Sequence, residues 1–431
     1  MNFCNSENIF AEEQNGFRKK RSCDDHIFSL STIIQNRMND GNSTFCAFVD
    51  LEKAFDWLNR DLLLLKLLKY RIDGRMFNAI KSLLQGTESC ILLNKSLQTN
   101  WFDILCGVRQ GDTLSPTLFS LFINDLVKEL KENGPTLNIN NFKLNCLLYA
   151  DDMVIIGDSP NNLQQLLDKL HTWCNKWRLK VNQSKTNVVH FRTSRTRQTD
   201  QVFNFGHFEL ETVSRYKYLG VILDENLSYN ICASALADSA GRALGAIIGK
   251  FKTLKNVGYE TFTKLYEAGV KPIMEYCCGV WGYIRGPELD QIQNRAMRYY
   301  LGVHKFAPNV GVEGEMGWLS PKLSRNLGLA RFWNRLMDME NNRLTKVIFI
   351  WDYGRGRSKW NSEIQKLFNY VELNNIYLQQ QKCDVNLLKE KLTEKFIIEW
   401  KDKISKKPKL RTYITFKDEF AVEEYVKFEK S

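Results

Sequence analysis

Two adjacent aspartates between two short apolar segments constrain the fold more than any other feature of this chain. The apolar segment Leu144–Leu148 leads into Tyr149–Asp152, whose last two residues are Asp151 and Asp152, and a second apolar segment, Met153–Ile156, follows. Short apolar runs on both sides of a polar turn are typical of buried strands. The pattern therefore predicts a strand pair with two carboxylates at its turn.

A third aspartate follows another apolar segment. Thr44–Val49 is rich in β-forming residues and ends at Asp50. Carboxylates at the end of one strand and at the turn of a strand pair can meet at one edge of a sheet, where they bind hard divalent cations such as Mg²⁺. The alternative is structural, since Asp151 and Asp152 are also common turn residues and Asp50 is a common helix N-cap. The aspartates alone favour that alternative.

Strand and helix patterns alternate before about residue 228, and helical patterns dominate after it. The first part has predicted strands at 44–49, 144–148, 153–156, 187–191 and 216–223, and predicted helices at 51–70, 74–84, 114–129 and 161–176. The second part has predicted helices at 233–251, 259–277, 289–301, 322–338 and 385–403. These patterns predict an α+β fold with a boundary near residue 228.

The net charge changes at the same boundary. Residues 1–228 hold 27 Lys and Arg against 26 Asp and Glu, whereas residues 229–431 hold 33 against 23. A basic part beside a neutral part is typical of a polyanion-binding region beside a catalytic region. Ordinary solvated helix surface is the alternative, and the charge alone does not choose between the two.

The composition disfavours several classes of protein. Eleven scattered cysteines, most of them in apolar runs, indicate reduced thiols, and the lack of a close Cys/His cluster predicts no zinc site. No apolar run reaches the roughly 18 residues of a membrane span, so we expect no membrane partner. The first 16 residues have neither a basic end nor an apolar centre. We therefore expect an intracellular protein, nuclear or cytoplasmic and not secreted.

Three motifs, in order, resemble those of reverse transcriptases, in particular the enzymes of non-LTR (LINE-type) retrotransposons. They are Phe48–Asp56, Gly107–Pro116 and Tyr149–Asp152. The resemblance covers about Glu13–Leu223 and implies a right-hand polymerase palm with an antiparallel sheet and partial fingers in residues 1–228. Further matching segments are Gln14–Arg18 in the fingers, Leu179–Thr186 as a fourth palm motif, and Tyr216–Gly220 as the strand turn that holds the primer end.

The second half resembles the helical region that follows the polymerase core in these elements. The matching segments are Gly269–Gly282 and Leu289–Gly302. They imply a mostly helical, thumb-like region at 229–310, followed by a helical, basic C-terminal region at 311–431. The excess positive charge suits contact with the backbone of a template and primer.

The resemblance also implies a function and a set of site residues. The function is RNA-directed DNA polymerase activity, which transfers nucleotides from dNTPs to a primer 3′-hydroxyl on an RNA template, with a DNA primer and two Mg²⁺ ions, or Mn²⁺ in their place. The implied catalytic and metal-binding residues are Asp50, Asp151 and Asp152. The implied nucleotide-binding residues are Phe55, Gln110, Arg18, Arg21 and Lys185, and the implied primer-binding residues are Tyr218, Leu219 and Gly220.

Phe55 and Lys185 have competing interpretations. Phe55 occupies the position at which a ring beneath the sugar excludes a 2′-hydroxyl, and the alternative is a core aromatic residue. Lys185 would protonate the leaving pyrophosphate or merely pair with a phosphate. Gln110 would line the nucleotide pocket next to a backbone that Gly107 and Gly111 make approachable.

The chain also departs from the family pattern. The first fingers strands and an endonuclease domain do not precede Gln14, so we expect a fragment that begins inside the fingers. An inert remnant that only binds nucleic acid is therefore the alternative function. An RNA-templated RNA polymerase is a third candidate, which Phe55 and the residues Tyr149-Ala150 before the aspartates disfavour.

Overall fold

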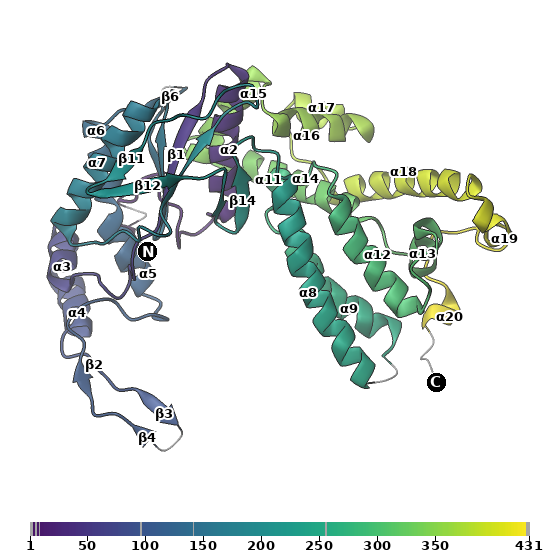
Figure 1. The fold of residues 1–431 in the computed structure, drawn as a ribbon, viewed down its shortest axis with the longest axis horizontal. Helices are drawn as coiled ribbons and strands as arrows, with labels where there is room; N and C mark the ends of the chain where they lie inside the picture. Colours follow the sequence, from purple (N-terminus) through teal and green to yellow (C-terminus); the bar gives the residue numbers. More distant parts are fainter. Residues whose placement is uncertain are drawn as a thin grey trace. The chain divides into compact units, whose positions relative to one another are not determined.

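The structure is a computed structural model that describes residues 3–4, 7, 9–94, 97–140, 142–254 and 257–427 (Figure 1). It divides into two compact units, and each is described by itself. Unit 1 comprises residues 1–227 and 341–351, and unit 2 comprises residues 228–340 and 352–431. The separate regions expected at 229–310 and 311–431 stay a prediction, because both contribute to unit 2.

Unit 1 combines one main sheet with helices and short hairpins. Its elements are α2 Cys23–Asn39, β1 Thr44–Val49, α3 Arg60–Lys69, α4 Gly74–Leu84, β2 Glu88–Ser89, β3 Leu92–Asn94, β4 Leu97–Gln98, β5 Phe102–Asp103, α5 Ser115–Ile123, α6 Asp125–Asn133, β6 Leu137–Ile139, β7 Phe142–Leu144, β8 Cys146–Tyr149, β9 Asp152–Gly157, α7 Pro160–Trp177, β10 Asn187–Phe191, β11 Phe203–Phe205, β12 Phe208–Thr212, β13 Arg215–Tyr218 and β14 Val221–Asp224.

The main sheet has six strands in the order β11-β12-β10-β1-β9-β8. β1 lies in the interior of the sheet, antiparallel to both β9 and β10, and β8 pairs antiparallel with β9. The predicted antiparallel sheet is confirmed except at β10 and β12, which pair in parallel. All six residues of β1 are buried, which explains why its sequence is apolar throughout.

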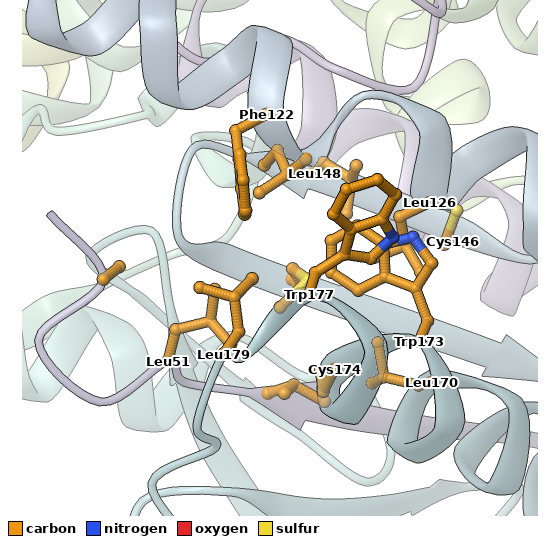
Figure 2. Packing of buried hydrophobic residues seen from close by; sticks show 14 of the residues in the cluster. Leu51, Phe122, Leu126, Cys146, Leu148, Leu170, Trp173, Cys174, Trp177 and Leu179 are labelled. Carbon is orange, nitrogen blue, oxygen red and sulfur yellow. The ribbon is translucent and has the colours of Figure 1, made fainter. Parts of the chain in front are cut away.

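One face of the sheet packs against α5, α6 and α7. Phe45, Ala47 and Val49 of β1 belong to the same apolar core as these helices. Figure 2 shows Trp173 and Trp177 of α7 among the apolar side chains of this core. The apolar positions of α7 recur at helical spacing and are buried, so the predicted amphipathic helix is confirmed.

The opposite face of β1 carries the β13–β14 hairpin. Phe48 points to this side, with its ring stacked on Tyr216 at a centroid distance of 4.5 Å and tilted against Tyr218 at 5.4 Å. Tyr218 and Val221 pair across a two-residue turn at Leu219 and Gly220, which both have positive φ. A turn with two positive φ values matches the twist of a tight hairpin.

Helix α2 is the main element of unit 1 that the sequence patterns missed. Eleven of its 17 residues are buried, and they include polar residues such as Asp25, His26, Thr32 and Asn36. A helix buried nearly all round, with polar groups among the buried positions, has no amphipathic period to detect.

Two predicted helices of unit 1 have different bounds from those expected. The segment predicted as helical from residue 51 becomes helical only at Arg60, after a series of turns. The helix predicted at 114–129 is divided at Asn124, whose side chain donates to the Ile9 carbonyl and accepts from the Ala11 amide, both at 2.8 Å. Long-range contacts of this kind have no local sequence pattern.

Unit 2 is helical in the part of the chain that the structure describes. Its elements are α8 Asn230–Leu254, α9 Tyr259–Gly269, α10 Lys271–Met274, α11 Cys278–Trp281, α12 Pro287–Leu301, α13 Asn309–Met316, α14 Pro321–Asp338, α16 Lys359–Tyr370, α17 Asn374–Leu378, α18 Val385–Ser405, η1 Pro408–Leu410, α19 Arg411–Ile414 and α20 Glu424–Lys427, while α15 Leu344–Arg355 begins in unit 1 and ends in unit 2. The helix predicted at 259–277 ends at Gly269, because Pro272 lies in the first turn of the next helix.

Among the residues that the structure describes, one helix meets the length and composition of a membrane span. The stretch Asn230–Thr253 of α8 has a mean hydropathy of 1.3, and 28% of its most apolar window is buried. We expected no such segment because no run of apolar residues in the sequence reaches the roughly 18 that a membrane span needs. In α8 the charged residues Asp238 and Arg242 lie among the apolar ones. A single helix of this kind is weak support for a membrane partner, since core helices of soluble proteins share these properties.

Candidate active site

The turn between β8 and β9 carries the two adjacent aspartates. Tyr149 pairs with Asp152 across the turn, and Ala150 and Asp151 form its tip. Ala150 is buried and has a φ of 56°, a left-handed conformation that is uncommon for a residue with a Cβ atom. The predicted position of the aspartates is therefore confirmed, and their turn needs support from its surroundings.

That support comes from Gln14, Asn15 and Gly16. The Gln14 Oε1 atom accepts hydrogen bonds from the amides of Gly16 at 2.8 Å and Ala150 at 3.2 Å. The Asn15 amide donates to the Leu148 carbonyl at 2.9 Å. A Cβ atom at Gly16 would lie 2.4 Å from the Ala150 amide nitrogen, so only glycine fits there. The segment holds the aspartate turn in its left-handed conformation.

Asp50 reaches the same edge of the sheet because β1 lies next to β9. Val49, the last residue of β1, pairs with Met153, the residue after Asp152. The Asp50 amide donates to the Thr186 hydroxyl at 3.3 Å, and the Asp50 carbonyl accepts from the Asn182 amide at 2.8 Å. The palm motifs that contain Asp50 and Asn182 are thus joined directly.

The three carboxylates repel one another. Burial, with a further contribution from the charge of Asp50, raises the pKa of Asp151. Burial and the charges of Asp151 and Asp50 raise the pKa of Asp152 to about 6. Both pKa values are raised because negatively charged groups lie close together where they are partly shielded from solvent. A divalent cation would neutralise this charge.

The carboxylate oxygens are suitable ligands for a metal ion, but the side chains are not arranged as a closed metal-binding group. Among the residues that the structure describes, no three His, Cys, Asp or Glu side chains form a group that could hold a metal ion. Oxygen donors with excess negative charge are nevertheless the donor set that Mg²⁺ prefers. The metal-binding assignment of Asp50, Asp151 and Asp152 therefore stays a prediction.

The loop at 107–111 lies against the turns that follow Asp50. The Val108 amide donates to the Phe55 carbonyl at 2.8 Å, and a Cβ atom at Gly107 would lie 2.5 Å from the Asp56 carbonyl oxygen. Gln110 Nε2 donates to Asp56 Oδ1 at 2.8 Å. The two predicted nucleotide-binding residues Phe55 and Gln110 therefore lie in adjoining segments.

The Phe55 ring is partly buried and makes aromatic contacts. It stacks on Phe119 at a centroid distance of 4.8 Å and meets the edge of Phe17 at 6.5 Å. The contacts agree with both interpretations of Phe55, so its role in sugar selection stays a prediction.

Arg18 and Arg21 are engaged with partners inside unit 1. Arg18 Nη1 donates to the carbonyls of Ala11 and Gln14 at 2.8 Å, and Arg21 makes a bidentate pair with Glu12 at 2.7 and 2.9 Å. The two guanidinium groups would have to leave these partners to contact a triphosphate. Their predicted role stays a prediction, and their observed role is to fix the entrance to α2.

Lys185 lies beside the carboxylates. Its exposed ammonium is 3.9 Å from Asp50 Oδ2. Tyr216 lies near the same edge, where its hydroxyl donates to the Lys185 carbonyl at 3.1 Å. Burial, together with the charges of Asp50 and Asp152, raises the pKa of Tyr216 to about 12. Tyr216 belongs to the segment Tyr216–Gly220, but the sequence did not predict that its side chain lies beside the carboxylates.

The predicted primer-binding residues lie in the β13–β14 hairpin. Tyr218 is fully buried, and its hydroxyl lies 3.4 Å from His26 Nδ1, so its side chain is part of the core. Leu219 and Gly220 are partly exposed at the turn. A primer contact there would use the turn and not the Tyr218 ring, and this assignment stays a prediction.

Comparison with known proteins identifies the family. The model of the family "Reverse transcriptase (RNA-dependent DNA polymerase)" matches residues 2–223. The chain is 26% identical over 303 residues to a probable RNA-directed DNA polymerase from transposon BS of Drosophila melanogaster, an alignment that covers 67% of this chain and 32% of the relative. It is 24% identical over 343 residues to the RNA-directed DNA polymerase from mobile element jockey of Drosophila funebris, covering 77% and 36% respectively.

Another relative belongs to a different element. A Pol polyprotein from the retrotransposable element R2DM of Drosophila melanogaster is 27% identical over 225 residues, which are 50% of this chain and 21% of the relative. A structure of telomerase from Candida albicans covers 75% of this chain and 54% of its own, at 11% identity and a TM-score of 0.29, too low to support any conclusion. The chain spans about a third of the length of the first relatives. The motifs, the fold of unit 1 and these matches show that the chain belongs to the reverse transcriptase family, among the non-LTR retrotransposon enzymes.

Proposed function

We propose that this chain is an RNA-directed DNA polymerase that extends a DNA primer on an RNA template. The observation that carries the proposal is the position of Asp50, Asp151 and Asp152 at one edge of the main sheet, where β1 lies next to β9. In that position burial, together with the charges of Asp151 and Asp50, raises the pKa of Asp152 to about 6. In the proposed reaction the primer 3′-hydroxyl attacks the α-phosphorus of a dNTP, a phosphodiester bond forms, and pyrophosphate leaves.

The residues of the site would divide this task. Asp50 and Asp151 would hold divalent ions, with Asp152 as the third carboxylate; bound ions of this kind activate the attacking hydroxyl and neutralise the leaving group. Lys185, whose ammonium lies 3.9 Å from Asp50 Oδ2, would pair with a phosphate oxygen or donate a proton to the pyrophosphate. Gln14 would position the turn through its bond to the Ala150 amide.

Primer extension by an Asp151→Asn variant tests the proposal. The variant keeps the shape of the side chain and removes one carboxylate charge, so we expect extension to be lost while affinity for a template–primer duplex stays within about tenfold. Asp200→Asn, a change at an exposed aspartate of unit 1, should leave both properties unchanged. Extension by Asp151→Asn at the wild-type rate would contradict the metal-ligand role.

A second candidate function is nucleic-acid binding without turnover. The observation that favours it is that no three metal-binding side chains form a closed group in the described part of the chain. Wild-type protein that binds template and primer but does not extend in Mg²⁺ or Mn²⁺ with dNTPs would support this candidate and contradict the first.

A further inference from the structure

The peptide unit between Gly107 and Val108 is held by hydrogen bonds at both ends. Its N–H group, which belongs to Val108, donates to the Phe55 carbonyl at 2.8 Å. Its carbonyl group, which belongs to Gly107, accepts from Arg60 Nε at 2.8 Å. Because a peptide unit is planar, two bonds on opposite sides of it restrict its rotation. The direction in which the chain continues toward Gln110 is therefore fixed here.

Arg60 is itself held firmly in unit 1. It is the first residue of α3, a helix that the Asn59 side chain caps by accepting a hydrogen bond in the first turn. Arg60 Nη1 bonds to three oxygens at the end of α4 and at the base of the β2–β5 hairpin. They are the Leu84 carbonyl at 2.6 Å, the Thr87 hydroxyl at 2.7 Å and the Ile104 carbonyl at 2.6 Å. A planar guanidinium group can join partners on two sides in this way.

A purely structural role for Arg60 is the alternative interpretation. The oxygens that Arg60 bonds are all neutral, so the side chain could serve only to fasten the hairpin to α3. That role needs the three bonds of Nη1, but it does not need the bond from Nε to Gly107. The bond to Gly107 connects Arg60 to the loop at 107–111.

That loop joins two residues of the predicted nucleotide pocket. Phe55, the predicted sugar-selecting residue, accepts from the Val108 amide, and Gln110 follows Val108 by two residues. Gln110 Nε2 donates to Asp56 Oδ1 at 2.8 Å, which orients the side chain. The Gln110 amide group also has a second N–H group and an oxygen that can bond a nucleotide. The position of this amide depends on the backbone that Arg60 holds.

We propose that Arg60 is a positioning residue for nucleotide binding. Through the Gly107 carbonyl it holds Gln110 and the Phe55 backbone in the geometry that accepts an incoming dNTP. The proposal rests on the proposed polymerase function, in which Gln110 contacts the nucleotide. Arg60 makes no contact with the substrate in this proposal, so its loss weakens dNTP binding more than it slows bond formation.

Hydrogen exchange followed by mass spectrometry tests the anchoring without catalysis. In the full chain, Arg60→Met should speed exchange in peptides that contain residues 107–110 by about tenfold or more, because the peptide unit is then held at one end only. A peptide from α7, which packs in the same unit, should exchange at the wild-type rate. Arg75→Met removes an exposed arginine of α4 and should change neither rate.

Two results of the exchange experiment would overturn the anchoring role. One is wild-type exchange at residues 107–110 in Arg60→Met. The other is an equal increase in the α7 peptide, which would show a general loss of stability. Arg60→Lys serves if the methionine variant does not fold, since lysine keeps the charge but cannot bond the Gly107 carbonyl and the hairpin together. Wild-type exchange at residues 107–110 in folded Arg60→Lys would also overturn the role.

The kinetic consequence is measured as separate kcat and KM values for dNTP. Arg60→Met should raise KM by about tenfold and lower kcat by less than about threefold. In a Gln110→Ala background the same substitution should raise KM by less than about threefold, because both residues act through one contact. A fall in kcat alone, or the same factor in KM in both backgrounds, would overturn the positioning role.

The two proposals fail separately. A wild-type chain that does not extend a primer contradicts the polymerase function, and hydrogen exchange then decides whether Arg60 anchors the loop. A wild-type chain that extends a primer, with an unchanged KM in Arg60→Met, contradicts the role of Arg60 and leaves the polymerase function in place.

Discussion

The two interpretations of Phe55 predict different sugar selectivity and different stability for a variant that lacks the ring. If its ring excludes a 2′-hydroxyl, Phe55→Val should raise ribonucleotide incorporation relative to deoxynucleotide incorporation, because the discrimination comes from a steric clash. If the ring only packs on Phe119, truncation should lower stability by about 3 kcal/mol and leave the ratio unchanged. Measuring kcat/KM for dNTP and rNTP together with a thermal melt separates the two.

Phe122→Val is the matched control for that experiment. Phe122 is fully buried in the same core, so its truncation should lower the melting temperature without changing the sugar ratio. An active Phe55→Val variant with the wild-type ratio would contradict the sugar-selection role.

His26 makes the stability of unit 1 depend on pH. Burial is the main reason that its pKa is lowered from 6.5 to about 3, with the positive charge of Arg21 adding to the effect and Asp25 opposing it. Below pH 6.5 the unfolded chain therefore binds a proton that the folded chain does not. We expect stability to fall as the pH decreases from about 6.5 toward 3, by up to about 1.4 kcal/mol per pH unit.

Urea unfolding between pH 7 and pH 4.5 measures this effect. His26→Gln keeps a polar group opposite the Tyr218 hydroxyl and should give a shallower dependence on pH. His207→Gln, at an exposed position, should retain the wild-type slope. An equal slope in His26→Gln would show that other groups cause the acid sensitivity.

At the scale of elements, the segment Gln14–Gly16 supports the turn of the β8–β9 hairpin. Gly16→Ala would place a Cβ atom 2.4 Å from the Ala150 amide nitrogen, so the segment and the turn would have to move apart. Displacing the aspartates by about an ångström is enough to reduce catalysis by about a hundredfold. We expect primer extension to fall by at least tenfold while the chain still folds.

Gly245→Ala is the matched control for the glycine substitution. Gly245 lies in α8, where an added Cβ atom meets no atom within 4 Å, so alanine should stabilise the helix by about 0.5 to 1 kcal/mol. A Gly16→Ala variant with normal extension would mean that the turn tolerates displacement from this segment.

At the scale of the whole molecule, unit 1 is completed by residues that follow most of unit 2 in the sequence. Arg343 Nη2 pairs with Asp25 at 2.9 Å, and Arg343 Nη1 donates to the Lys20 carbonyl at 2.9 Å. The Leu344 amide donates to Glu12 at 3.3 Å. The Asp25 carboxylate is fully buried, so removing the guanidinium would leave a buried negative charge without this cation.

We expect Arg343→Met to lower the free energy of unfolding of unit 1 by about 3 to 5 kcal/mol. Removing one partner of a buried ion pair leaves the other charge buried without its partner, which is more destabilising than replacing both partners by apolar residues. The double variant Arg343→Met with Asp25→Asn should recover part of that loss in a double-mutant cycle. Arg197→Met removes an exposed partner of Asp200 and should change stability by less than about 1 kcal/mol. A loss in Arg343→Met no greater than in Arg197→Met would show that the buried pair contributes little.

The sequence alone predicted the elements with a regular apolar pattern. β1 and β10 have the bounds that the apolar residues indicate, and α7 is one residue longer at each end than predicted. The aspartate turn lies between two strands as expected. The motifs also predicted the family, because three ordered matches around Asp50, Gln110 and Asp151 do not arise from secondary structure alone. Local periodicity and motif order are properties of the sequence itself, so they can be read without a fold.

Tertiary structure decided the features that depend on contacts between distant segments. α2 has no amphipathic period because it is buried nearly all round. Arg343 belongs to unit 1 because its guanidinium pairs with the fully buried Asp25 carboxylate. The support that Gln14 gives to Ala150 and the proximity of Tyr216 to the carboxylates arise in the same way. A buried polar group is satisfied by whichever segment the fold brings to it, and that choice leaves no pattern in the neighbouring residues.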